Sequence, residues 1–463
     1  MDAPLMRVPH PGPHTRRYVE RLRRTEPAAG LSFGLSADGL VLRRGQGAVV
    51  EDVDGNRFLD FVAGFGSLNA GHCHPQITAA IQRQAGLAAQ AMGMAGEVRI
   101  DLAERLIDLV SAGVARDDAA GHRVLFSTSG SEAVEVALKL ARRATGRQQV
   151  VAFAGGFHGR TSGALSLMGR ASQWQGLGVS SPGAYHVPYP YPLRSPFGDD
   201  PDTVVDGTLG YLDACLSNPS GGWQPPAAVV VEPVQGNGGM IPAPAGFLRG
   251  LRDLCDRHGM LLVVDEVMSG FHRTGRVFAY LREEGVEPDI VVLGKSLSAG
   301  LPLAACVARA EVADASPAGT ETSTYSGNLV SCASALAALE VYEQERLGER
   351  AVTLGDYFVA RLGEIAGHHA IVGEVRGCGL MVAVELVADD SNRPLALARE
   401  ASRRAIRHGL LIYPGGHYDN VIAYLPPLTI DESHIDIAVE ITDDVLGELP
   451  GALPGELSTT EKQ

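Results

Sequence analysis

Short apolar runs alternate with helical stretches between residues 75 and 310, and this alternation constrains the fold more than any other feature of the chain. Stretches such as PQITAAIQRQAGLAAQ and EAVEVALKLARRA have helical periodicity. The strand-like runs are RVLFS, QVVAF, AAVVVEPV, MLLVVDEV, DIVVLG and LAACVA. Apolar strands bracketed by helices predict an α/β fold in which helices cover both faces of a mostly parallel sheet.

The flanking sequence predicts further parts. We expect residues 1–74 to form an N-terminal segment with a helix and a small antiparallel hairpin that turns at Asp54-Gly55. Residues 75–335 then form the large domain and residues 336–450 a smaller C-terminal α/β domain. The polar stretch 451–463 is expected to be a disordered tail.

Composition argues against several classes of function. The net charge of −15 disfavours nucleic acid as a partner. No apolar run reaches the ~18 residues of a membrane span, and the N-terminus lacks the apolar core of a secretory signal. The six cysteines are scattered without a C-x-x-C pair, so we expect reduced thiols and no metal site. These features suit a cytoplasmic enzyme.

Three ionisable residues directly follow apolar strands. They are Glu232, Asp265 and Lys295. Ligands of parallel sheets bind beyond the carboxyl ends of the strands, so these side chains are expected along one rim. A strand-end lysine on its own is more often a surface residue whose charged end reaches water.

A short polar loop, Ser129-Gly130-Ser131, follows RVLFS and leads into a helix. Backbone N–H groups at a helix start, together with hydroxyls, form a phosphate cradle. The alternative is an ordinary helix cap, because Ser129 with Glu132 three residues later matches a capping box.

Together, the loop, the acid and the lysine match the needs of one cofactor, pyridoxal 5'-phosphate. This cofactor needs a lysine for a Schiff base, an acid that keeps the pyridine nitrogen protonated, and a phosphate site. Lys295 follows Asp265 by 30 residues, each at a strand end, and the two supply the first two requirements.

Several motifs in order resemble the class III, fold type I aminotransferases, the family of ornithine, 4-aminobutyrate, diaminobutyrate and diamine aminotransferases. The resemblance covers about residues 40–440. It is carried by FLDFVAGFGSLNAGHCHP, SGSEAVEVALKLARR, FHGRT, VEPVQGNGG, VVDEVMSGFHRTG, LGKSLSAGLP, TSTYSGN and LPPLTI.

The resemblance implies roles for single residues. Phe157 corresponds to the aromatic that stacks on the cofactor ring, Asp265 to the partner of the pyridinium and Val267 to the apolar contact on the other face. Thr324 corresponds to a residue given to the neighbouring subunit's phosphate, which implies a homodimer with active sites at the interface. The expected cofactor site comprises Ser129, Gly130, Ser131, Phe157, His158, Glu232, Gln235, Asp265, Val267, Lys295 and Thr324.

The implied chemistry centres on Lys295. A substrate amine displaces the lysine from the imine, and the freed lysine moves a proton as general base and acid. The products are an aldehyde or keto compound and the amino form of the cofactor, which a second substrate reconverts in a ping-pong sequence. The substrates are therefore an amine and a keto acid or aldehyde.

The chain departs from the family pattern at two linked positions. Asn237 stands where many members carry a glutamate, and Ala423 stands where many carry an arginine that grips a substrate α-carboxylate. The joint absence of the glutamate and the arginine is physically consistent, because a buried glutamate without its arginine partner would destabilise the fold. We therefore expect the substrate carboxylate to be bound elsewhere or to be absent. Arg160, Arg194 and Arg273 are the candidates for another carboxylate grip, and pyruvate, an amine or a non-standard acceptor suits the chain as well as 2-oxoglutarate does.

Two further residues shape the expected pocket. Phe65 replaces a tyrosine of ornithine aminotransferase-like chains, and Met268 replaces a frequent glutamine. Both favour a less polar substrate, although core packing explains either equally well.

Two other functions remain open at this point. A racemase or epimerase, an aminomutase or a decarboxylase would use the same lysine on the same fold. A binding or scaffold protein that has lost catalysis is disfavoured by the intact Lys295, Asp265 and phosphate loop.

Overall fold

The structure is a computed structural model that describes residues 2–27, 39–112, 121–170, 173, 177, 183–388 and 393–450. The chain divides into two compact units. The larger unit is Gln76–Ala351, and the smaller unit combines Met1–Pro75 with Val352–Gln463. The expected tail at 451–463 lies outside the described residues, and the domain boundaries expected at 74 and 335 stay a prediction.

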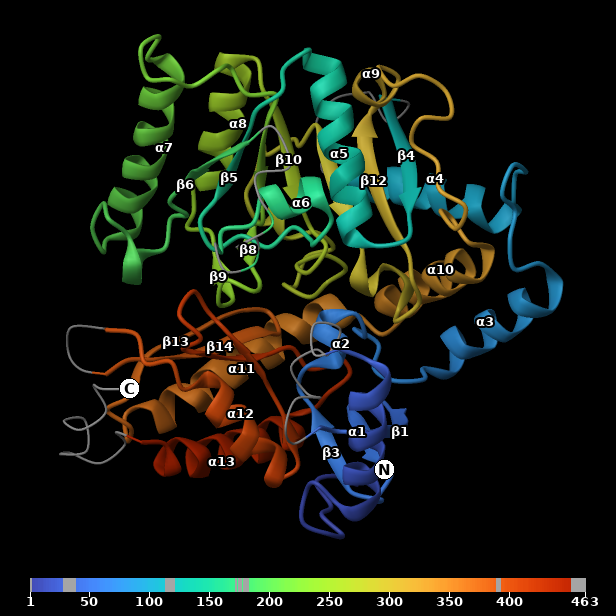
Figure 1. The fold of residues 1–463 in the computed structure, drawn as a ribbon, viewed down its shortest axis with the longest axis vertical. Helices are drawn as coiled ribbons and strands as arrows, with labels where there is room; N and C mark the ends of the chain where they lie inside the picture. The colour runs from blue at the N-terminus through green and yellow to red at the C-terminus, as the bar shows by residue number, and fades with distance from the viewer. Residues whose placement is uncertain are drawn as a thin grey trace. The chain divides into compact units, whose positions relative to one another are not determined.

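The larger unit is built on a seven-stranded sheet, seen in the upper part of Figure 1. In spatial order its strands are β4 (His122–Ser127), β12 (Ala304–Arg309), β11 (Ile290–Leu293), β10 (Leu261–Asp265), β7 (Ala228–Val231), β5 (Val150–Phe153) and β6 (Ala184–Val187). Strand β12 runs antiparallel to both of its neighbours, and the other pairings in the sheet are parallel. The expected mostly parallel α/β sheet is therefore confirmed.

Helices cover both faces of this sheet. On one face α5 (Gly130–Thr145) and α6 (Ser162–Ser166) bury alternate residues of the central strands, and the Cys306 thiol of β12 donates to the Ala133 carbonyl of α5 at 3.2 Å. The intervening strand residues are also buried, and α8 (Phe247–His258) packs on β7 and β10. The unit also contains α3 (Pro75–Leu87), α4 (Glu97–Ser111), α7 (Pro201–Ser217), α9 (Ala310–Ala313), α10 (Leu329–Gln344) and the hairpin β8 (Val234–Gln235) and β9 (Ile241–Pro242).

The smaller unit holds two four-stranded sheets. One contains β1 (Leu42–Gln46), β2 (Val49–Asp52), β3 (Arg57–Asp60) and β15 (Leu410–Leu411), and the other contains β13 (Val372–Cys378), β14 (Met381–Leu386), β17 (Val421–Tyr424) and β16 (Tyr413–Gly415). Strands β2 and β3 pair across the turn at Asp54-Gly55, where Gly55 has a φ of 82° that favours glycine. Its helices include α1 (Pro13–Thr25), α2 (Ala63–Gly66), α12 (Ala398–Arg407) and α13 (Glu432–Glu448), while α11 (Leu347–Ala366) begins in the larger unit.

Two structural features, apolar helices and cysteine thiols, bear on the expectations from composition. No helix among the described residues combines the length and apolar character needed to cross a membrane. All six cysteines are free thiols, and four of them are buried.

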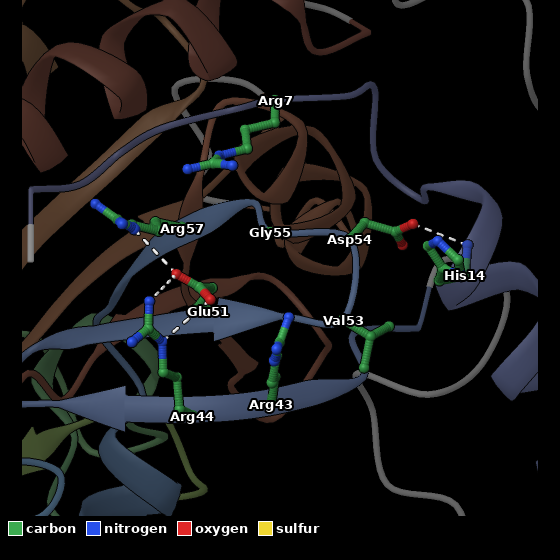
Figure 2. A pocket seen from close by; sticks show the side chains of 9 residues that line it. All are labelled: Arg7, His14, Arg43, Arg44, Glu51, Val53, Asp54, Gly55 and Arg57. Carbon is green, nitrogen blue, oxygen red and sulfur yellow. Dashed lines mark hydrogen bonds and ion pairs between the residues drawn. The ribbon is translucent and has the colours of Figure 1, made fainter.

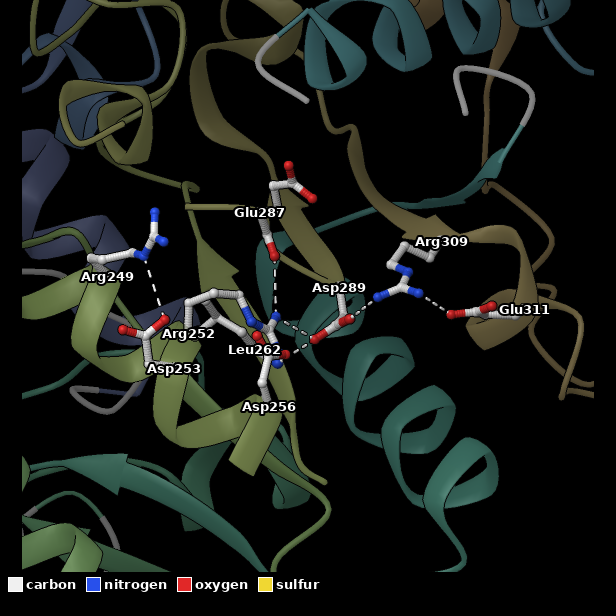
Figure 3. A network of polar contacts seen from close by, with 9 residues as sticks. All are labelled: Arg249, Arg252, Asp253, Asp256, Leu262, Glu287, Asp289, Arg309 and Glu311. Atoms are coloured by element: carbon white, nitrogen blue, oxygen red, sulfur yellow. Dashed lines mark hydrogen bonds and ion pairs between the residues drawn. The ribbon is translucent and has the colours of Figure 1, made fainter. Parts of the chain in front are cut away.

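A buried carboxylate connects two strands of the large sheet and a helix that packs on it (Figure 3). Asp289, directly before β11, accepts hydrogen bonds from the Leu262 backbone N–H of β10 at 2.7 Å, from Arg252 of α8 at 2.7 Å and from Arg309 of β12 at 2.8 Å. Its side chain is 2% exposed and that of Arg252 is 10% exposed. The network aligns the amino end of β11 with the strands on either side of it.

This network predicts a large effect on stability from a single substitution. Asp289→Ala leaves the buried Arg252 guanidinium without its main partner, which typically costs about 3–5 kcal/mol of unfolding free energy. Asp256→Ala removes another partner of Arg252, at 2.8 Å, but the Asp256 side chain is 67% exposed, so its loss should cost less than about 1 kcal/mol. Guanidinium unfolding followed by circular dichroism measures both, and equal losses would contradict a dominant role of Asp289.

Candidate active site

The carboxyl ends of three parallel strands bring the ionisable residues expected from the sequence to one edge of the sheet. Val231 of β7 pairs with Val264 of β10, and Asp265 of β10 pairs with Val292 of β11. Glu232 follows β7, and Lys295 lies two residues beyond the end of β11. Both carboxylates act electrostatically on the lysine amine, so the three groups form one site.

Lys295 has a left-handed backbone conformation. Its φ is 46°, which is unusual for a residue with a side chain and carries strain. It opens a short 3-10 helix, Lys295–Ser298, that α10 holds through two side chains. The Tyr342 hydroxyl donates to the Ser296 carbonyl and the Ser334 hydroxyl to the Ser298 carbonyl, both at 2.7 Å. These hydrogen bonds fix the turn that presents the amine.

The amine of Lys295 is prepared for nucleophilic chemistry by its surroundings. Burial lowers its pKa to about 8, the nearby carboxylates of Glu232 and Asp265 oppose this shift, and the Arg273 guanidinium adds to it. Arg273 is itself fully buried, and burial lowers its own pKa to about 9. A substantial fraction of Lys295 is therefore the neutral amine at pH 8, unlike an ordinary lysine with a pKa near 10.4.

Asp265 is paired with a buried histidine. Its Oδ2 lies 2.7 Å from His158 Nδ1, and its Oδ1 accepts from the Val267 backbone N–H at 3.0 Å. Burial alone would lower the pKa of His158, but the hydrogen bond and charge of Asp265 outweigh it, so that this pKa is raised. The next residue, Glu266, instead binds Ser269 and the Tyr280 backbone N–H, so the acidic pair at this strand end divides into a site residue and a structural one.

Glu232 organises the loops around the site. Its Oε1 accepts from the Phe157 backbone N–H at 2.8 Å and its Oε2 from the Gly236 N–H at 3.0 Å. Burial raises the pKa of its carboxyl group. The next loop residue of the expected set, Gln235, donates to the Ala154 carbonyl at 2.9 Å. Glu232 therefore acts as a positioning residue for the loop that carries Phe157 and His158.

The polar loop before α5 serves as a helix cap and leaves donors available for an anion. Ser129 Oγ accepts from the Glu132 N–H at 3.3 Å, and Glu132 Oε2 accepts from the Thr128 N–H at 2.7 Å. The first two helical residues are Gly130 and Ser131, and the described hydrogen bonds include none from their backbone N–H groups. A Cβ on Gly130 would lie 3.0 Å from Val267 Cγ1, so glycine permits the close approach of loop and strand end.

Phe157 and Arg160 lie beside this loop. The Arg160 guanidinium is 5.8 Å from the centroid of the Phe157 ring, a distance suited to a cation–π contact. The Arg160 backbone N–H donates to Ser131 Oγ at 3.2 Å. Arg160 is exposed and Arg194 is half-buried, whereas Arg273 is fully buried. Of the three arginines considered from the sequence, Arg160 is thus the most accessible to a substrate.

Thr324 lies on an exposed loop that is anchored to α5. Glu321, three residues earlier, forms ion pairs with Lys139 and Arg143 of that helix, although the Glu321 side chain is only 4% exposed. The Thr324 carbonyl accepts from Gln90 Nε2 at 2.7 Å. The Thr324 side chain is thereby held at the surface of the chain.

Phe65 and Ala423 belong to the smaller unit. Phe65 has a φ of 59° in a tight turn, and its ring packs edge-on against Tyr413 with 5.3 Å between centroids. Asp60 stabilises this turn by accepting from the Ala63 N–H at 2.9 Å. Ala423 is fully buried in β17.

Three side chains near Lys295 act in ways that no sequence motif indicates. Tyr342 and Ser334 lie on a helix with no polar motif, and the electrostatic effect of Arg273 on Lys295 was not anticipated. One local signal marks Arg273, its place in the G-F-H-R-T-G stretch. Among the described residues, no group of three histidine, cysteine or acidic side chains is arranged to hold a metal ion.

Comparison with known proteins supports this geometry. The family model for Aminotransferase class-III matches residues 35–446. The chain is 39% identical over 409 residues to a diaminobutyrate–2-oxoglutarate aminotransferase of Rhizobium meliloti, with 86% of each chain covered. It is 33% identical to an alanine/serine racemase of Pyrococcus horikoshii, covering 96% of this chain and 92% of that one. An amine transaminase structure from an uncultivated Pseudomonas species, in the PLP-bound form, matches with a TM-score of 0.82 and 35% identity over 91% of this chain and 98% of that one.

The fold and the strand-end lysine define a pyridoxal-phosphate-dependent enzyme of the α/β type. The chain belongs to the class III aminotransferases, with pyridoxal phosphate as the cofactor. The residues present fit this group. The open N–H groups at Gly130 and Ser131 suit a phosphate, the buried Asp265–His158 pair suits a protonated pyridine nitrogen, and the neutral amine of Lys295 suits an aldehyde.

The lowered pKa of Lys295 predicts a distinctive pH profile. In the cofactor-free protein, labelling of Lys295 by a small aldehyde and borohydride should rise to half its maximum near pH 8, because only the neutral amine reacts. The chain has three lysines, at positions 139, 295 and 462, so peptide mass spectrometry can follow each one. Lys139, with a side chain 44% exposed, is the internal control. Identical profiles for Lys139 and Lys295 would contradict the role of burial.

Proposed function

We propose that this aminotransferase moves an amino group from an ω-amino acid, a diamine or another primary amine to a keto acid or aldehyde. The observation that carries the proposal is the buried Lys295 amine, with its lowered pKa, at the same sheet edge as the Asp265–His158 pair. Relatives at 37–39% identity support this substrate class, because they are named for the donors diaminobutyrate, 5-aminovalerate and 4-aminobutyrate.

Each residue of the site has a task in the proposed reaction. When bound, the cofactor supplies an electron sink that makes the substrate C–H bond acidic. Lys295 Nζ would hold the cofactor, and as a free amine it would act as the general base that accepts the proton from the substrate carbon and as the general acid that donates it again. Asp265, held by His158, would be the partner of the pyridine nitrogen. The N–H groups of Gly130 and Ser131 bind the phosphate.

Arg160 is the proposed grip for a substrate carboxylate. Its guanidinium is exposed and lies over the Phe157 ring beside the phosphate loop. A planar guanidinium binds a carboxylate through two parallel hydrogen bonds. Because Ala423 and Asn237 cannot form the arginine–glutamate pair of related enzymes, pyruvate or a non-standard acceptor suits the chain as well as 2-oxoglutarate does.

Half-reactions test the proposed function directly. Purified enzyme mixed with a panel of ω-amino acids, diamines and aromatic amines, without an acceptor, should lose the visible absorption band of the bound cofactor in one stoichiometric turnover. Adding a keto acid should restore the band, and Lys295→Ala should lack it from the start. Solvent deuterium uptake with inversion of an amino acid and no loss of the band would indicate a racemase instead, as in the Pyrococcus horikoshii relative.

The same screen tests Arg160. Arg160→Gln should raise the concentration of ω-amino acid needed for half-maximal conversion at least about tenfold, which corresponds to roughly 1.4 kcal/mol. Diamines, which have no carboxylate, should change less than about twofold. Arg194→Gln removes the same charge and is the matched control. If Arg194→Gln alone discriminated against carboxylates, the grip would have to be reassigned.

We further propose that the chain is a homodimer whose subunits each donate Thr324 to the other's site. Exposed apolar side chains lie in two segments, the one that follows α3 and the Thr324 loop: Leu87 is 80% exposed and Met94 68% in the first, and Tyr325 63% in the second. The Asn328 side chain donates to the Ala89 carbonyl at 2.8 Å and so joins the two segments. Large exposed apolar groups of this kind are typical of an interface.

Six free thiols favour a reducing compartment, which supports a cytoplasmic location.

The dimer proposal predicts coupled losses in one variant. Sedimentation should give the mass of two chains for the wild type. Leu87→Glu/Met94→Glu should shift it towards one chain and weaken retention of the cofactor, because Thr324 would no longer reach the partner's phosphate. Tyr211→Glu, at another exposed apolar position with 45% exposure, should leave both unchanged. A double variant that remains dimeric would exclude this surface as the interface.

A further inference from the structure

A second cationic site lies in the smaller unit. The arginine groove is lined by Arg7, Arg43, Arg44 and Arg57 together with Glu51 and Asp54, and has a volume of about 460 Å³ (Figure 2). It forms where the N-terminal segment crosses the sheet of β1, β2 and β3. Leu5 and Arg57 exchange backbone hydrogen bonds of 3.0 and 2.8 Å at this crossing. The groove contains none of the residues assigned to amino transfer.

Both carboxylates of the groove are already occupied. Glu51 binds Arg44 through hydrogen bonds of 3.1 and 2.7 Å and Arg57 through one of 3.1 Å. The hydrogen bond with Arg44 is the main reason that the pKa of Glu51 falls to about 2. Asp54 turns away to the start of α1, where it accepts from the backbone N–H groups of His14 and Thr15, both at 2.8 Å. Neither carboxylate is available to another cation.

Two arginines remain uncompensated. Within the described part of the chain, the guanidinium groups of Arg7 and Arg43 take part in no ion pair or hydrogen bond, and Figure 2 shows both beside the Glu51 cluster. Four arginines against Glu51 and Asp54 leave a local surplus of positive charge in a chain whose net charge is −15. Arg7 and Arg43 are both exposed, so solvent and salt weaken their repulsion, and an anion bound between them would offset what remains.

The backbone that carries this charge is held firmly. The Arg7 N–H donates to Asn56 Oδ1 at 2.8 Å, and the Asn56 N–H donates in turn to Asp52 Oδ1 at 2.8 Å. Asp52 is fully buried. The Arg7 side chain passes over Gly55, where an added Cβ would lie 3.4 Å from Arg7 Cδ. Arg7 therefore lies on a segment fixed to the β2–β3 turn, and Arg43, Arg44 and Arg57 lie on strands of the sheet, so none of the four is carried on a free end.

We propose that the arginine groove binds a small organic anion that carries at least two carboxylate or phosphate groups. Two unpaired guanidinium groups call for two acidic groups, and the planar arginine fork matches both oxyanions. The volume is that of a metabolite site. The strongly acidic chain as a whole repels a long polyanion, so the ligand is small.

Binding to the holoenzyme tests the proposal. Pyrophosphate and citrate are titrated separately by calorimetry, with the cofactor in place and ionic strength held constant with sodium chloride. One equivalent per chain of at least one probe should bind. Pyrophosphate alone indicates a phosphate ligand, citrate alone a polycarboxylate, and both indicate a site selective only for charge and size.

Two matched double variants separate the groove from general charge effects. Arg7→Gln/Arg43→Gln should weaken binding at least tenfold while the visible absorption of the bound cofactor stays intact. Arg17→Gln/Arg407→Gln removes the same charge from exposed positions outside the groove, and should change binding less than twofold. Absence of binding by either probe, or equal weakening in both double variants, would overturn the proposal. Because the readout is binding rather than turnover, the result does not depend on the proposed function.

Discussion

The hydrogen-bonded register between β10 and β11 is the constraint on which the site depends. Asp265 lies opposite Val292, three residues before Lys295. Both strands are buried, and a slip of one residue would turn every side chain of a strand to the other face of the sheet. The separation of the acid and the lysine is therefore fixed by the backbone ladder and not by contact between the two side chains. Asp289, bound to β10, α8 and β12, fixes the other end of the same strand.

Burial disfavours the charged forms of the ionisable groups at this site, and hydrogen bonds and nearby opposite charges oppose that effect. The Asp265 charge is matched by His158, and the Glu232 carboxyl accepts from two backbone N–H groups. Lys295 has carboxylates nearby, yet burial dominates and its pKa is lowered. A buried lysine with a lowered pKa suits covalent amine chemistry, because only the unprotonated amine attacks.

Much of the site could be predicted from sequence because it is encoded locally. Apolar runs identify the strands, and the residues directly after them fall at the carboxyl edge, as with Asp265 and Lys295. The two interpretations of Ser129-Gly130-Ser131, cap and phosphate cradle, prove compatible: the Ser129 side chain caps the helix while the next two N–H groups remain available.

The rest could not be predicted because it rests on contacts between distant segments or on backbone conformation. The hydrogen bond from Tyr342 to Ser296 spans 46 residues, and no local pattern marks it. The hydrogen bond from the Phe157 N–H to Glu232 likewise joins residues far apart in the sequence, while the expected role of Glu232 at the cofactor stays a prediction. Strand β6 is short and half-exposed, so its residues lack the apolar signal of the other strands. The left-handed turn at Phe65 appears only in the backbone angles.

The position of strand β15 in the chain affects the order in which the sheets can form during synthesis. It pairs in parallel with β3, so the N-terminal sheet receives its fourth strand from Leu410 and Leu411, far along the chain. The larger unit, by contrast, is continuous from Gln76 to Ala351. A ribosome that releases the chain from its N-terminus therefore supplies every strand of the cofactor-binding sheet before it supplies the strand that completes the first one. The sheet that begins first along the chain is therefore completed after the sheet of the larger unit.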